Sequence, residues 1–187
     1  MSGFMGSQDL SNYALKTELG NPYNSLLYNH ELVGPCAIAI PVTITGDFSA
    51  TFDVICNNAG TYGVKLVLST YFPTEVDTDE PYCYVDIRGN NSTVVKYRNA
   101  GSGVTNSSLT AAYSSNAYDT VSVTWYNEDK IDYQINSAAV VSTAKGAAAF
   151  DFTVFKLLTV VIPFGSTYYY QSAMIKNFAL SGNITIG

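Results

Sequence analysis

The chain has 187 residues and a formal net charge of −6, and 47% of its residues are hydrophobic while only 13% are charged. This length and apolar content suit one domain with a sizeable core and exclude a chain that is disordered throughout. An acidic surface repels a phosphate backbone, so we expect no nucleic-acid binding. No apolar run approaches the roughly 18 residues that span a bilayer, so we expect no membrane insertion.

Residues 7–20 carry the helical pattern of the sequence. Asp9 or Ser11 can cap the start of this helix, and Gly20 can end it. A helix of about three turns is marginal alone in water, so it must pack on its own domain or on copies of itself. The residues that would make such a contact form two neighbouring stripes: Leu10, Ala14 and Thr17, then Leu15 and Leu19.

The sequence of this segment resembles a repeat of phage and prophage tail-fibre proteins. Residues 9–19 read Asp-Leu-Ser-Asn-Tyr-Ala-Leu-Lys-Thr-Glu-Leu, with Leu15 where the repeat usually has Thr. In those proteins the repeat is a short trimeric helix between fibre modules. The resemblance implies a homotrimer held by an oligomerisation segment, residues 1–22, ahead of a second domain, residues 23–187. The alternative is a capped helix that lies on its own domain.

Alternating apolar and polar residues predict β-strands from residue 36 onward. Pro41 falls within the first strand pattern, over 36–44, and predicts an edge strand or two short strands with a break. Residues 99–115 are rich in Gly, Ser, Thr and Asn, and we expect them to wrap around the domain. Four clearer strands are predicted between these segments, over 48–54, 64–69, 82–87 and 93–98.

A hairpin over residues 117–135 is the clearest element of the sequence. Polar, turn-prone residues at 127–130 separate two arms in which every second residue is apolar. This pattern predicts one buried face, on which Trp125 fills the gap between two sheets. Beyond the hairpin we expect a short helix or a loose crossover over 138–149, a strongly apolar strand over 150–162, a final strand over 173–180 and a short tail.

The order of strands over 47–182 resembles a concanavalin A-like (laminin G-like) jelly roll. The likeness depends mainly on the hairpin phrase at 125–133 and the closing phrase at 175–182. Many short strands with turns at fairly regular intervals also favour an antiparallel sandwich or barrel. We therefore predict an all-β fold, an antiparallel β-sandwich of the jelly-roll kind, with a short N-terminal helix.

The sequence lacks the residue patterns of common catalytic sites. His30, the only histidine, has no nucleophile signature near it. Glycoside hydrolysis needs two carboxylates across a cleft, and neither Asp86 nor Asp132 has an acidic partner two residues before it in its strand. We therefore expect no enzymatic activity.

A loop over 75–80 is the candidate calcium site. Its oxygen ligands could come from Asp77, Asp79 and Glu80. It lacks the glycine and the acidic twelfth position of an EF-hand, which favours a solvated acidic loop instead. We expect no other metal or cofactor.

The cysteines and the N-terminus bear on where the chain folds. The chain has an odd number of cysteines, Cys36, Cys56 and Cys83. We expect each to be a small buried thiol in a chain that folds in a reducing cytoplasm. The alternative is one disulfide with the third cysteine left as a free thiol. The first residues lack the basic and apolar regions of a signal peptide. Together with the tail-fibre resemblance, this predicts a virion protein assembled in the host cytoplasm.

Tyrosine is the main functional clue. The chain has 15 tyrosines, and exposed ones offer an apolar face and a polar tip that suit sugar rings and protein interfaces alike. The leading hypothesis is a non-catalytic tail-fibre or receptor-binding module that contacts a host surface glycan or other virion proteins. The alternatives are a monomeric bacterial carbohydrate-binding or adhesin module and a structural capsid or fibre decoration protein. The candidate glycan contacts are Tyr82, Tyr84, Tyr126, Tyr168, Tyr169 and Tyr170.

Overall fold

The computed structural model describes residues 32–33, 36–56, 64–70, 82–87, 92–98, 104–110, 117–144, 151–162 and 173–187. The helix predicted over 7–20 and the domain boundary at residue 22 lie outside these ranges. No helix in the described residues is long and apolar enough to cross a membrane. The strands are β1 (Leu32–Val33), β2 (Cys36–Cys56), β3 (Val64–Ser69), β4 (Tyr82–Ile87), β5 (Ser92–Arg98), β6 (Val104–Thr110), β7 (Asp119–Tyr126), β8 (Lys130–Ile135), β9 (Val141–Ala144), β10 (Leu157–Ile162) and β11 (Ala173–Ile186).

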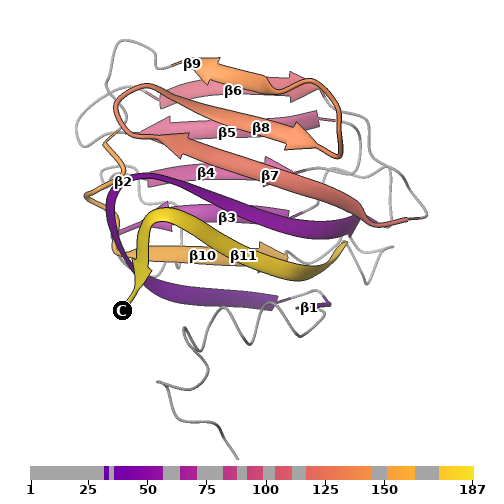
Figure 1. Cartoon of the computed structure of the whole chain (residues 1–187), viewed down its shortest axis with the longest axis horizontal. Helices are drawn as coiled ribbons and strands as arrows, with labels where there is room; N and C mark the ends of the chain where they lie inside the picture. The colour runs from indigo at the N-terminus through magenta and orange to yellow at the C-terminus, as the bar shows by residue number, and fades with distance from the viewer. Residues whose placement is uncertain are drawn as a thin grey trace, which may run out of the picture.

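These strands form two antiparallel sheets that lie face to face (Figure 1). The first, here called the β4 sheet, has the order β6-β5-β4-β3-β10-β2. The second, called the β7 sheet, has the order β1-β11-β2-β7-β8-β9. The predicted all-β antiparallel sandwich is therefore confirmed.

Strand β2 belongs to both sheets, and Pro41 marks the point where it changes from one to the other. Residues 36–41 pair with β10 in the β4 sheet, and the strand then continues beside β11 in the β7 sheet. Figure 1 shows this strand curving around one edge of the sandwich. Proline cannot donate to a ladder, and an edge strand tolerates this loss. The predicted edge strand is confirmed, but the predicted break is wrong, because β2 stays extended from Cys36 to Cys56.

The core fills the space between the two sheets with every second side chain of each strand. Trp125 is fully buried and stacks on Phe48, with ring centroids 4.7 Å apart and an angle of 10° between the rings. Phe152 meets the ring of Phe48 edge-on at 6.5 Å. The prediction that Trp125 fills the gap between two sheets is confirmed.

Two cysteines have described side chains, and both are free thiols. Cys83 is fully buried in the core, as predicted, and Cys36 is partly buried. Burial raises the pKa of the Cys83 thiol to about 12, and an interaction with Trp125 offsets this in part. Burial likewise raises the pKa of Cys36, although a backbone hydrogen bond with Ile162 lowers it in part.

Two edge strands, β6 and β9, were not predicted. Strand β6 lies in the polar segment that we expected to wrap around the domain, and β9 lies where we expected a short helix or a crossover. Each is an edge strand held by the backbone of one neighbour, β5 or β8. Neither strand has a clear alternating apolar pattern, and backbone pairing with the neighbouring strand supplies its extended conformation.

The two last strands differ from the prediction in their bounds. Strand β10 begins at Leu157, and a turn region before it carries the buried Phe155. Strand β11 does not end near residue 181 but continues to Ile186. Two irregularities in its pairing with β2 permit this, and the second lies at Gly182, which has a φ of +91°. A Cβ there would sit 2.7 Å from the carbonyl oxygen of Asp47, so only glycine fits.

Candidate functional site

The predicted tyrosines do not form a single site in the part of the chain that the structure describes. Tyr82 and Tyr84 lie on the outer face of β4, because Cys83 between them points into the core. Tyr126 lies on the outer face of β7, next to the buried Trp125. Since the two sheets pack face to face, their outer faces point away from each other. The structure therefore divides these tyrosines between two opposite surfaces.

The remaining predicted contacts lie outside the described residues and stay predictions. They are the tyrosines Tyr168, Tyr169 and Tyr170, the calcium ligands Asp77, Asp79 and Glu80, and the oligomerisation residues Leu10, Ala14, Leu15, Thr17 and Leu19.

The two tyrosines of β4 stack along their strand, and we call Tyr82 and Tyr84 the tyrosine row. Their ring centroids are 5.9 Å apart, and the ring planes differ by 13°. Both residues are half-buried, so each ring keeps one part open to solvent. From the neighbouring strand β3, the Lys65 Nζ lies 5.6 Å from the centroid of the Tyr84 ring, a cation–π contact.

The row has two rings because the next residue on the same face of β4 is Asp86. This residue is only 3% exposed, so the accessible part of the row is aromatic. In the β3–β4 ladder Asp86 lies directly opposite Lys65. On the other side of β4, the backbone of Tyr82 pairs with Arg98 and that of Tyr84 pairs with Lys96. Basic residues are thus paired with the row on the β5 side, whereas on the β3 side Ser69 and Val67 lie opposite Tyr82 and Tyr84.

A row of this kind suits a ligand that has both apolar and hydroxylated parts. An aromatic ring covers the C–H face of a sugar, while the phenol oxygen can donate or accept a hydrogen bond. The stack and the lysine contact hold the rings in place before a ligand arrives, which lowers the entropy lost on binding. The geometry is therefore appropriate for a saccharide.

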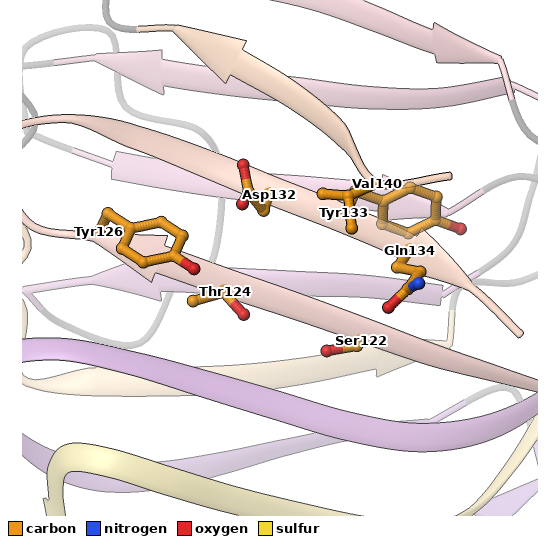
Figure 2. A pocket seen from close by; sticks show the side chains of 7 residues that line it. All are labelled: Ser122, Thr124, Tyr126, Asp132, Tyr133, Gln134 and Val140. Carbon is orange, nitrogen blue, oxygen red and sulfur yellow. The ribbon is translucent and has the colours of Figure 1, made fainter. Parts of the chain in front are cut away.

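The outer face of the β7–β8 hairpin carries a separate depression, shown in Figure 2. It has a volume of about 200 Å³. Two tyrosines, four polar residues and one valine line it: Tyr126, Tyr133, Ser122, Thr124, Asp132, Gln134 and Val140. Of these residues, only Tyr126 was predicted as a ligand contact from the sequence. For Ser122, Thr124, Asp132 and Gln134 the signal was the polar half of the alternation that predicted the buried face of the hairpin, whereas Val140 lies outside both strands.

Catalytic and metal-binding arrangements can be judged only within the described residues. No group of three or more His, Cys, Asp or Glu side chains there could hold a metal ion. Asp132 is the carboxylate in the lining of the depression, and its Oδ2 accepts a hydrogen bond from Lys130 at 3.0 Å. This hydrogen bond is the main reason that the pKa of Lys130 is raised. With one carboxylate, the depression lacks the pair that glycoside hydrolysis requires.

Comparison with known proteins identifies the fold. No family model and no curated protein sequence matches the chain. The structure nevertheless superposes on a point variant of human galectin-16 with a TM-score of 0.53, at 8% identity, over 80% of this chain and 96% of that one. The fold is that of the galectins. Sheep galectin-11 gives a TM-score of 0.51 at 10% identity, over 80% of this chain and 99% of that one.

A nematode protein gives a similar result. Galectin LEC-6 of Caenorhabditis elegans has a TM-score of 0.51 at 11% identity, over 83% of this chain and 98% of that one. The galectin-like match covers almost the whole of each of these proteins, so the jelly-roll sandwich predicted from the strand order is confirmed. Identities this low show the fold alone, and the function must be argued from the chain's own residues.

Proposed function

We propose that this chain is a non-catalytic glycan-binding module of a virion, a tail-fibre or receptor-binding protein that meets a host surface saccharide through the tyrosine row. One observation carries the glycan-binding part. Tyr82 and Tyr84 present two nearly parallel, half-buried rings on the outer face of a sheet in a galectin-like fold.

The rest of the surface supports a polar, uncharged partner. Only 13% of the residues are charged, so hydroxyl, amide and phenol groups supply most of the polar surface. Such groups exchange hydrogen bonds with sugar hydroxyls without requiring a charged ligand.

The virion part of the proposal depends on residues 9–19, which resemble the tail-fibre repeat. A trimer formed through residues 1–22 would present three tyrosine rows to one cell surface. Shallow saccharide contacts are weak one at a time, and linking several of them raises the overall affinity by large factors without any new contact. Trimerisation would therefore raise the overall affinity of the module for a glycan-covered surface.

A glycan array tests the glycan-binding part. The full chain is compared with a Tyr82→Ala/Tyr84→Ala variant and with a Tyr82→Phe/Tyr84→Phe variant that keeps both rings. We expect reproducible array signals for the wild type, partial retention in the phenylalanine variant and loss in the alanine variant. An alanine variant that stays folded by circular dichroism and binds as well as the wild type would refute the assignment.

The oligomeric state tests the virion part separately. Light scattering over a wide range of concentrations should give a trimer. A monomer that still binds glycans would instead favour the bacterial carbohydrate-binding or adhesin module. A trimer that binds neither glycans nor host cells would favour a structural capsid or fibre decoration protein.

A further inference from the structure

The depression on the β7–β8 hairpin has the features of a second ligand site, independent of the tyrosine row. In Figure 2 Tyr126 lies at one end and Val140 at the other, with the polar side chains of β7 and β8 between them. The ladder register pairs Thr124 with Asp132 and Ser122 with Gln134 across the two strands. Because both strands belong to one tight hairpin, this set of side chains is fixed by local structure.

Hydrogen bonds hold the polar side chains of the depression in place. The hydroxyl of Thr124 shares a hydrogen bond with that of Ser49 at 2.8 Å. The carboxylate of Asp132 accepts from Lys130 through one oxygen and from Ser142 through the other. An ionised carboxylate has about four lone-pair sites, so two can still accept hydrogen bonds from a ligand.

The amide of Gln134 is oriented in the same way. Its Nε2 donates to the carbonyl oxygen of Ala138 at 2.9 Å. This contact fixes which end of the amide is the acceptor, and Figure 2 shows the Gln134 oxygen on the side of Ser122. Side chains that are ordered before binding lose less entropy when a ligand arrives.

The two ends of the depression supply apolar contact. The ring of Tyr126 is half-buried, and the Lys130 Nζ lies 4.8 Å from its centroid. Val140 is 51% exposed, so its methyl groups are accessible to a ligand. An aromatic ring, an aliphatic group and hydroxyl-binding groups between them match the alternating C–H faces and hydroxyls of a sugar ring.

Charge and size narrow the class of ligand. Lys130 and Asp132 form an ion pair, so the depression carries no net charge that would select an anion or a cation. Its volume of about 200 Å³ is below the roughly 300 Å³ at which drug-sized ligand pockets begin, which limits it to one ring. A contact this small and open gives weak affinity, in the millimolar range.

We propose that this depression binds one neutral pyranose residue, stacked on Tyr126 and hydrogen-bonded by Thr124, Asp132 and Gln134. Each chain would then carry two saccharide contacts that face in opposite directions, one on each sheet. The proposal does not depend on the tyrosine row, which lies on the other face of the sandwich.

Amide NMR spectra of the isotope-labelled full chain test this proposal. The probes are methyl β-D-galactopyranoside, methyl α-D-glucopyranoside and methyl α-D-mannopyranoside, each titrated into the millimolar range. We expect at least one of them to shift the Gln134 side-chain amide and the backbone amides of residues 122–126 along a saturable curve. Tyr126→Ala should weaken that binding by roughly two- to tenfold, the range that corresponds to the loss of one aromatic contact.

Two further variants separate this site from the rest of the surface. Thr185→Val removes an exposed hydroxyl from β11 of the same sheet, outside the depression, and should leave the response at Gln134 unchanged. Tyr82→Ala/Tyr84→Ala should also leave it unchanged, whatever happens to the amides of β4. The absence of a saturable shift in the depression with all three glycosides, or an equal response in Tyr126→Ala, would overturn the proposal.

Discussion

Replacing Trp125 by alanine tests what holds the two sheets together. The indole is fully buried and stacks on Phe48 at 4.7 Å. Truncation of a buried Trp to Ala costs about 3–5 kcal/mol through lost transfer free energy and the cavity that remains. An aromatic pair contributes about 0.5–1.5 kcal/mol beyond area burial, so we expect a loss near the upper end of the first range. This is a large share of the roughly 5–15 kcal/mol that stabilises a typical domain.

Urea denaturation followed by far-ultraviolet circular dichroism measures this loss, because the variant has no tryptophan fluorescence. We expect the midpoint to fall while the slope of the transition stays unchanged. Trp125→Phe should cost less, since a ring remains to stack on Phe48. Ser122→Ala, on the outer face of the same strand, should stay within about 0.5 kcal/mol. A loss of less than about 1 kcal/mol for Trp125→Ala would show that the ring is not a core residue.

Three further predictions concern the backbone, a buried thiol and the N-terminal segment. Gly182→Ala should destabilise the fold by about 1–3 kcal/mol, because Gly182 has a φ of +91° and the new Cβ would meet the Asp47 carbonyl; an unchanged thermal midpoint would contradict this. The Cys83 thiol has an ordinary pKa of 9.0 in the unfolded chain and a pKa of about 12 when folded, so its contribution to stability is complete below pH 9 and declines as the pH rises toward 12. Cys83→Ala should flatten this part of a urea-denaturation pH profile, and an identical profile would refute the assignment. Deleting residues 1–20 should weaken or abolish oligomerisation in light scattering while circular dichroism shows a folded sandwich; loss of the sandwich would place the helix in its core.

The sequence predicted the parts of the fold that have a buried face. In the hairpin, the apolar row at Trp125 and Ile131 is buried and the intervening residues face outward. The same alternation correctly placed β3, β4 and β5. A strand that buries one face must alternate, so its pattern is readable without a partner.

The sequence could not predict strands that owe their conformation to a neighbour. Strands β6 and β9 are edge strands, and most of their residues are polar or small. The edge strand predicted from Pro41 is confirmed, but no feature of the sequence around Pro41 shows that β2 continues from one sheet into the other. That passage depends on which strands lie on either side, here β10 and β11.

For the candidate sites, too, one part could be predicted from the sequence and another could not. Alternation placed Tyr82, Tyr84 and Tyr126 on outer faces, which the structure confirms. It could not show that these rings belong to different sheets, because that depends on how the strands pair. The residues around Tyr126, such as Thr124 and Gln134, become a site only when the two arms of the hairpin lie side by side.

The proposed function depends on glycan binding by the tyrosine row. Isothermal titration calorimetry tests it most directly, with the strongest glycan from the array titrated into the full chain and into Tyr82→Ala/Tyr84→Ala. Each aromatic contact is worth about 0.5–1.5 kcal/mol, so loss of both rings should weaken binding by roughly five- to 150-fold. Equal affinities for the two proteins, both folded and in the same oligomeric state, would contradict the account.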